Sequence, residues 1–211
     1  MVEAAVVNVI PKVQPQAVQF EHHRRVGIYG GTFNPVHNAH LLVAEQVGRT
    51  LSLEKVAFLP DMQPPHRDYK GTIAADLRVD MLKLATADNP FFDIEMEEIN
   101  RGGVSYTYDT IKALKEKHPD TDYYFIIGGD MVDYLPTWNK IDQLVELVNF
   151  VGVRRKGAKN ETHYPVIWVD VPTVEISSSD IRARVKNGQS IRYMVPKAVE
   201  DYIKEHQLYI D

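Results

Sequence analysis

The sequence predicts an α/β fold, with a doubly wound, mainly parallel sheet followed by a short C-terminal helical region. Short apolar runs of strand length alternate along the chain with longer segments of helical periodicity. Such alternation indicates parallel strands that are covered by helices on both faces. Glycine- or serine-containing turns follow several of the expected strands, and ligands bind at this edge of such sheets.

The composition fits one domain of an ordinary globular protein. The chain has 211 residues, which is enough for a substantial core. It contains no cysteine, so disulfides and thiolate metal sites are excluded, and we expect a reducing, cytoplasmic location. The net charge of −5 argues against a nucleic-acid partner. No apolar run reaches the ~20 residues of a membrane span, and a homodimer is left open.

The N-terminal segment differs from the rest of the chain. Residues 1–25 contain Pro11 and Pro15 and end in a polar cluster, so we expect an extension that is mobile or docks on a neighbouring subunit. Residues 26–211 are expected to form a single domain.

The first expected strand, Val26 to Tyr29, leads into the segment with the clearest chemistry. Two glycines follow it, which would let the backbone turn sharply beside a ligand. A helical pattern then begins, with Asn38 as the expected N-cap. His37 and His40 share the first turn of that helix, whose free N–H groups favour an anion. Phosphate is the expected ligand.

Five further strands and five further helices are expected along the chain. The strands are 55–59, 92–96, 123–127, 150–153 and 166–169, and the longer helices are 73–85, 105–118, 141–147, 177–186 and 196–206. Thr72 is the expected cap of the first of these helices. Pro196 is expected as the first residue of the last helix, and Gly188 as the stop of the helix before it.

The glycine turn and the histidines each have a less specific interpretation. The glycines form neither the G-x-G-x-x-G of dinucleotide dehydrogenases nor a P-loop. A single histidine would more often be structural, but His37 and His40 together beside a glycine turn favour phosphate contact. No H-E-x-x-H zinc motif is present.

A second group of polar residues opens the helix at 177–186. Hydroxyl groups of Ser177 and Ser178 can cap this helix or donate to phosphate. Arg182 lies one turn after Ser178 and can make a forked phosphate contact. Taken alone, the segment is better explained as an ordinary capped helix with a solvated arginine.

Together the two segments resemble the nucleotidylyltransferase superfamily. The carrying motifs are G-G-T-F-N-P-V-H-N-A-H from Gly30 to His40 and I-S-S-S-D-I-R from Ile176 to Arg182. Motifs at 64–66, 105–110 and 126–131 are similar to the branch of bacterial nicotinate-nucleotide adenylyltransferases. The resemblance implies a Rossmann-like fold and transfer of the adenylyl group of ATP to nicotinate mononucleotide, which gives deamido-NAD and pyrophosphate.

The resemblance also implies roles for the matching residues. His37, His40 and Arg182 are the implied catalytic residues, and ATP would also contact Gly30, Gly31, Thr32, Phe33, Ile176, Ser177 and Ser178. Nicotinate mononucleotide would contact Asn34, Tyr106, Thr107, Tyr108, Asp130 and Trp138. Trp138 would stack on the pyridine ring, backbone N–H groups at 106–108 would receive its carboxylate, and Asp130 would bind a ribose hydroxyl. The alternative for Asp130 is a helix cap, and that for Trp138 is core packing.

The implied chemistry needs alignment more than a protein base. The second pKa of a phosphate monoester is about 6, so the acceptor phosphate is largely ionised at neutral pH. Mg²⁺ is expected as a cofactor bound mainly through substrate phosphates, with no protein metal site. The alternatives are adenylyl transfer to nicotinamide mononucleotide or to phosphopantetheine, or a nucleotide-binding module without catalysis. His37 speaks against the phosphopantetheine branch, where threonine is usual at this position.

Overall fold

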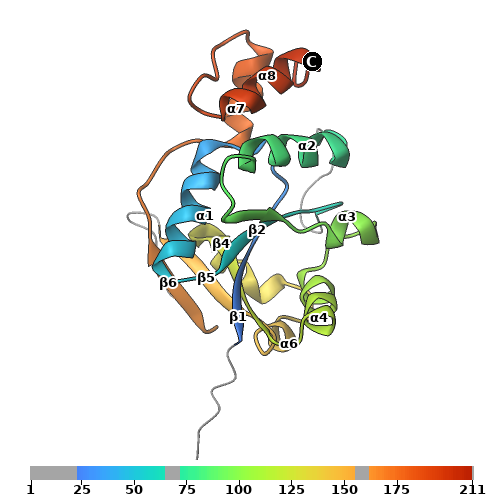
Figure 1. Ribbon diagram of the computed structural model, residues 1–211, viewed down its shortest axis with the longest axis vertical. Coiled ribbons are helices and arrows are strands. Elements are labelled where there is room, and N and C mark those ends of the chain that lie inside the picture. The colour runs from blue at the N-terminus through green and yellow to red at the C-terminus, as the bar shows by residue number, and fades with distance from the viewer. Residues whose placement is uncertain (1–22, 65–71, 155–161, 211) are drawn as a thin grey trace, which may run out of the picture.

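The computed structural model describes residues 23–64, 72–154 and 162–210. Within these segments, six strands form one parallel sheet in the order β3-β2-β1-β4-β5-β6 (Figure 1). The strands are β1 (Arg24–Gly31), β2 (Lys55–Pro60), β3 (Phe92–Ile94), β4 (Thr121–Gly128), β5 (Asn149–Arg154) and β6 (Val166–Asp170). This confirms the predicted sheet, whose order reverses between β1 and β4, and such a reversal is where α/β sheets bind ligands.

Helices cover both faces of the sheet. They are α1 (Asn38–Thr50), α2 (Ala75–Thr86), α3 (Glu97–Arg101), α4 (Thr107–Lys117), α5 (Gly129–Val132), the 3₁₀ helix η1 (Leu135–Thr137), α6 (Ile141–Leu144), α7 (Ser178–Lys186) and α8 (Lys197–Glu205). The last two lie together at one end of the molecule, at the top of Figure 1. They form the predicted C-terminal helical region.

The core has two layers because side chains alternate along each strand. In β2, Val56 and Phe58 pack in a cluster with α1, α2, α7 and α8. Their neighbours Ala57 and Leu59 pack in a second cluster with α4, α5 and α6. The sheet is therefore doubly wound, as predicted.

The two glycines at the end of β1 do not form the predicted turn. Gly30 and Gly31 lie in the strand and pair with the last residues of β2. A Cβ atom on Gly30 would lie 2.8 Å from the Phe125 ring, and one on Gly31 would lie 3.1 Å from the Phe33 ring. The glycines are thus explained by close packing of aromatic rings, and the turn starts at Thr32.

Helix starts also differ from the predictions at three places. His37, not Asn38, is the N-cap of α1. Thr72 is not a cap, because α2 starts only at Ala75. Pro196 lies at the N-cap of α8 and not inside it. In each case the apolar periodicity located the helix, but it could not locate the residue where the backbone enters it.

Two other elements are shorter than expected, and one predicted helix end is confirmed. The strand expected at 92–96 ends at Ile94 because α3 begins three residues later. The helix expected at 141–147 is the short α6. Gly188 is confirmed as a stop, since it follows α7 with a φ of 65° that glycine adopts without strain.

The start of β1 bears on the expected N-terminal boundary. Arg24 and Arg25 already pair with Thr121 and Asp122 of β4. Residues 1–22 lie outside the described residues, so the proposed extension stays a prediction. Among the described helices, none has the length and apolar character to cross a membrane.

The packing of α1 against the sheet gives a stability prediction. A Cβ atom on Gly48 would lie 2.5 Å from the Phe91 ring and 2.9 Å from the Val56 side chain. We expect Gly48→Ala to lower the free energy of unfolding by about 1–3 kcal/mol, despite alanine's better helix propensity. Urea unfolding measures this. Gly128→Ala is the control, because a Cβ atom there meets nothing within 4 Å, and an equal loss in both variants would contradict the prediction.

Candidate active site

A cavity of about 650 Å³ lies at the carboxyl ends of the parallel strands. It is lined by the ends of β1, β2, β4 and β5, the start of α1, the segment before α4 and the start of α7. The predicted site residues that line it are Gly30, Gly31, Thr32, Phe33, Asn34, His37, His40, Tyr106, Thr107, Trp138, Ile176, Ser177, Ser178 and Arg182. Segments from opposite ends of the chain therefore meet in one site, as predicted.

The two histidines at the start of α1 form a stacked pair. Their ring centroids are 3.6 Å apart and the rings are inclined by 17°. The backbone N–H of His37 donates to Nδ1 of His40 at 3.2 Å. Because this nitrogen accepts, the neutral His40 ring carries its proton on Nε2, which is then available as a donor. The Nδ1 atom of His37 is buried and has no hydrogen-bond partner in the described part of the chain.

Burial keeps both imidazoles neutral in the free protein. It lowers the pKa of His37 from 6.5 to about 4. It also lowers the pKa of His40 well below its ordinary value, and repulsion by the neighbouring His37 adds to this effect. At neutral pH the pair therefore offers N–H donors to a phosphate without carrying two positive charges.

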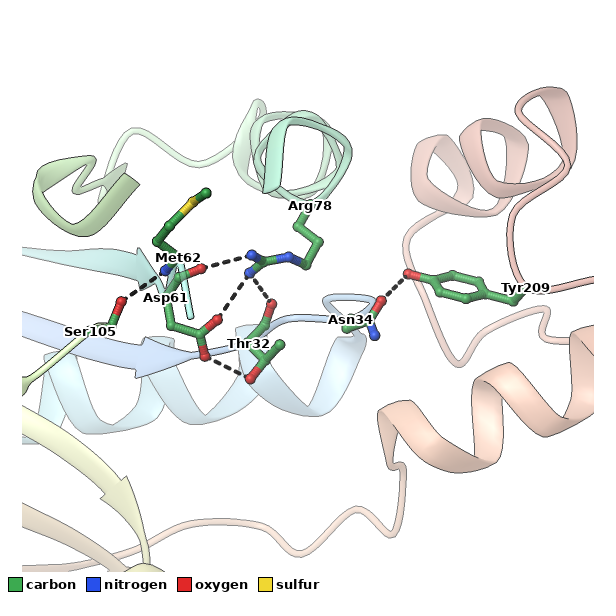
Figure 2. Close-up of polar contacts among 7 residues, drawn as sticks. All are labelled: Thr32, Asn34, Asp61, Met62, Arg78, Ser105 and Tyr209. Atoms are coloured by element: carbon green, nitrogen blue, oxygen red, sulfur yellow. Dashed lines mark hydrogen bonds and ion pairs between the residues drawn. The ribbon is translucent and has the colours of Figure 1, made fainter. Parts of the chain in front are cut away.

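The turn between β1 and α1 is tied to the sheet by a buried arginine (Figure 2). Arg78 of α2 is fully buried, and its Nη1 and Nη2 atoms donate to the carbonyls of Thr32 and Asp61, each at 2.8 Å. The guanidinium also pairs with the Asp61 carboxylate at 3.3 Å, and that carboxylate accepts the Thr32 hydroxyl at 2.7 Å. The paired charges and shared hydrogen bonds make burial of both side chains tolerable.

Sequence reasoning missed Arg78 and Asp61. The available signal was an arginine on the buried face of a helix, one turn before Met81 and Leu82. A charged side chain at such a position requires a buried partner. Nothing in the local sequence identified Asp61 as that partner.

The start of α7 holds the same turn from the other side. Ser177 caps the helix as predicted, accepting the Asp180 N–H at 3.1 Å. Ser178 donates to the carbonyl of Pro35, and Arg182 donates to that of Asn34, each at 2.8 Å. Backbone carbonyls in a tight turn lack partners within the turn, and these side chains supply them.

The N-terminus of α1 is less open than the sequence predicts. The backbone N–H of Asn38 donates to the carbonyl of Met194 at 2.9 Å, and the Asn38 side chain donates to the carbonyl of Tyr193. One amide of the expected anion site is therefore already occupied by the segment between α7 and α8. The side chains of His37 and His40 line the cavity here and can donate to an anion.

A buried polar cluster that sequence reasoning did not identify also borders the cavity. Ser105 accepts the backbone N–H of Met62 at 2.9 Å, which joins the end of β2 to the segment before α4. Glu98 is 4% exposed, lines the cavity, and accepts the Thr110 hydroxyl at 2.8 Å. Burial raises the pKa of Glu98, although hydrogen bonds from Thr110 and Ser105 oppose the rise.

Trp138 also lines the cavity. Its ring meets Phe125 and Phe150 edge-on, with centroids 5.9 and 5.8 Å away. Its buried Nε1 atom has no hydrogen-bond partner among the described residues. Trp138 therefore packs against the core and also lines the cavity. Core packing and contact with a ligand ring are thus compatible interpretations of this residue.

Two predicted residues do not line the cavity. The Tyr108 side chain packs against the α4 and α6 core and lies beneath the Lys140 ammonium, 4.5 Å from the ring centroid. Asp130 is exposed inside α5, whose N-cap is Gly128, so it is not the helix cap considered as its alternative. In each case a neighbouring residue of the same helix, Thr107 or Met131, lines the cavity instead.

Protein ligands for a metal do not gather in the described segments. No group of three or more histidine, aspartate or glutamate side chains there could hold a metal ion.

Comparisons with known proteins agree with this geometry. A family model described as cytidylyltransferase-like matches residues 28–184. A Lactiplantibacillus plantarum protein named "Probable nicotinate-nucleotide adenylyltransferase" is 59% identical over 94% of each chain. An Enterococcus faecalis protein of the same name is 56% identical, covering 94% of this chain and 91% of its own.

Solved structures of other proteins share this fold. The structure of a Plasmodium falciparum nicotinic acid mononucleotide adenylyltransferase complexed with NaAD superposes with a TM-score of 0.76 at 22% identity, over 89% of this chain and 98% of that one. This likeness concerns the fold, whereas the much closer sequence relatives identify the branch. The chain belongs to the cytidylyltransferase-like family, and within it to the nicotinate-nucleotide adenylyltransferases.

Proposed function

We propose that this chain transfers the adenylyl group of ATP to nicotinate mononucleotide, giving deamido-NAD and pyrophosphate. One observation carries the proposal: the stacked histidines and the start of α7 share a single cavity with the Ser105–Thr107 segment and Trp138. A site for a nucleotide phosphate thus adjoins a site for an aromatic acceptor. The names of the close relatives support the same reaction.

The acceptor phosphate is the nucleophile. One of its oxygens forms a bond to the α-phosphorus of ATP, and the bond from that phosphorus to the bridging β-phosphate oxygen breaks. The electron pair leaves with pyrophosphate. No proton has to be removed from the nucleophile, because a phosphate monoester is largely ionised at neutral pH. The enzyme's contribution is alignment of the two anions and stabilisation of the developing charge.

The ATP side is formed by the histidine pair, the turn after β1 and α7. His40 Nε2–H and the His37 ring donate to the phosphates, with His40 nearest the reacting phosphorus. Arg182 already holds the Asn34 carbonyl, so its remaining N–H groups contact phosphate without the turn being released. Backbone from Gly30 to Phe33 and the residues Ile176 to Ser178 line the rest of the nucleotide site.

The acceptor side is formed by Trp138, Asn34 and the start of α4. The tryptophan face packs on the pyridine ring, and backbone N–H groups at 106–108 receive the nicotinate carboxylate. These backbone groups do not require the Tyr108 side chain to reach the cavity. Contact between Asp130 and a ribose hydroxyl stays a prediction.

Mg²⁺ fits this site as an ion held through the substrates. The described residues offer no carboxylate cage, and Mg²⁺ commonly retains water and substrate phosphate oxygens as its ligands. When bound, it neutralises charge on the phosphates and on the leaving pyrophosphate. The expected cytoplasmic location, the homodimer and the docking role of residues 1–25 stay predictions.

The proposed reaction is tested by a panel of acceptors. We expect pyrophosphate release from ATP and Mg²⁺ with nicotinate mononucleotide, and much less with nicotinamide mononucleotide or phosphopantetheine. A coupled pyrophosphate assay measures the three rates at equal acceptor concentration. Pyrophosphate release with phosphopantetheine but with neither pyridine mononucleotide would overturn the proposal. If none of the three acceptors supports release, the result would favour a nucleotide-binding module without catalysis.

Removal of the histidine donor should affect catalysis far more than folding. We expect His40→Ala to lower kcat about 10²–10³-fold, the usual loss when one donor to a developing charge is removed. The fall in melting temperature should be small beside the catalytic loss, because His40 is only partly buried and its ring accepts one hydrogen bond, from the His37 N–H. His118→Ala, at an exposed histidine after α4, is the matched control and should keep full activity. Unaltered turnover in His40→Ala would remove this residue from the mechanism.

The lowered histidine pKa values predict a pH dependence of stability. Folding holds His37 neutral down to about pH 4, whereas the unfolded chain takes up a proton near pH 6.5. Above pH 6.5 the free energy of unfolding does not depend on this residue's titration. As the pH falls from 6.5 towards 4, the free energy of unfolding decreases by about 1.4 kcal/mol per pH unit, because only the unfolded chain binds the proton. Urea unfolding between pH 7 and 4 should show a shallower loss in His37→Asn than in the wild type or His118→Asn. An unchanged slope would contradict the prediction.

A further inference from the structure

The last turn of the chain reaches into the turn that carries the catalytic motif. The hydroxyl of Tyr209 donates to the side-chain oxygen Oδ1 of Asn34 at 2.8 Å, across 175 positions of sequence (Figure 2). Asn34 is 5% exposed and lines the cavity. Tyr209 itself does not line it. Tyr209 therefore contacts Asn34 from outside the cavity lining.

The backbone on both sides of this contact is held in an uncommon conformation. Phe33, directly before Asn34, has a φ of 48°, and Tyr209 has a φ of 64°. Left-handed backbone at aromatic residues persists only where surrounding contacts hold it in place. For the C-terminal segment those contacts include buried Leu208, whose N–H donates to the Ile203 carbonyl at 3.0 Å. The segment is thus anchored independently of the Tyr209 hydroxyl.

The hydroxyl is suited to orienting the amide of Asn34. Burial raises the pKa of Tyr209, so its proton is retained over the whole working pH range of the protein. A donor at Oδ1 distinguishes the two ends of the amide, which otherwise have the same shape. The amide group of Asn34 is therefore fixed in one orientation, with its N–H₂ end turned away from Tyr209.

We propose that Tyr209 is a positioning residue for the adenylyl transfer, acting through the side chain of Asn34. The inference rests on the proposed function, in which Asn34 contacts nicotinate mononucleotide. The C-terminal segment after α8 then supports the acceptor side of the site from outside the cavity lining. Arg78 holds the Thr32 carbonyl and Arg182 the Asn34 carbonyl, so the backbone of the turn is fixed without Tyr209. The Tyr209 hydroxyl contacts the Asn34 side chain and not this backbone.

Tyr209→Phe tests this directly, because it removes one oxygen and keeps the ring packed. We expect kcat/KM for nicotinate mononucleotide to fall roughly tenfold, as for loss of one hydrogen bond to a buried polar group. KM for ATP and the melting temperature should change little. Tyr202→Phe is the matched control, since this α8 tyrosine donates to Asp80 at 3.4 Å and does not line the cavity.

A double-mutant cycle separates an effect of Tyr209 on the orientation of Asn34 from an effect on the stability of the fold. If Tyr209 acts through Asn34, Tyr209→Phe should add almost nothing to the loss already caused by Asn34→Ala. Independent, multiplying losses would overturn the proposal. So would an equal loss in Tyr202→Phe, or a lower melting temperature with unchanged kcat/KM.

The wild-type assay keeps this test distinct from the test of the proposed function. Lack of wild-type turnover with nicotinate mononucleotide counts against the proposed acceptor and against the role given to Asn34. Normal wild-type turnover with an unaffected Tyr209→Phe variant counts against the positioning role alone.

Discussion

The site depends first on one buried ion pair, between Arg78 and Asp61. An unpaired charge in this position would cost several kcal/mol, so the guanidinium, the carboxylate and their hydrogen-bonded partners must assemble together. The pair joins α2, the end of β2 and the turn after β1 through contacts of 2.7–3.3 Å. Because that turn leads directly into His37, its geometry decides where the histidines point. The left-handed backbone of Phe33 is tolerable only inside such a frame.

The same turn explains why the C-terminal helical region belongs to the active site. Ser178 and Arg182 satisfy two of its carbonyls, Met194 binds the first amide of α1, and Tyr209 binds the Asn34 side chain. Residues that resemble phosphate ligands in the sequence therefore also have a structural task. A variant at Arg182 would remove the proposed phosphate donor and also the hydrogen bond to the Asn34 carbonyl. For this reason substitutions at Tyr209 and His40, which leave the turn's carbonyl contacts intact, are the cleaner probes.

Sequence reasoning succeeded where information is local and failed where it is not. Apolar runs located the strands, and motif spacing located His37, His40 and Ser177, because these features depend on neighbouring residues. Arg78, Asp61, Glu98 and Tyr209 were missed, because each acquires its role from a partner distant in the sequence. Gly30 and Gly31 were assigned to a turn although packing of aromatic rings requires them in a strand. Tyr108 and Asp130 matched a motif, yet their side chains lie outside the cavity, since a motif specifies residues and not the direction of every side chain.

Neutral histidines suit a reaction in which charge arrives with the substrates. Two imidazolium rings stacked at 3.6 Å would repel each other, and burial already disfavours the charged form of each. A permanently charged pair would bind any phosphate tightly in the ground state, and uniform binding of this kind does not raise kcat. A neutral pair interacts most strongly where negative charge increases, and bound phosphates in turn favour its protonation. In the proposed mechanism the pair interacts more strongly as the bond to pyrophosphate breaks, and this differential stabilisation would lower the barrier.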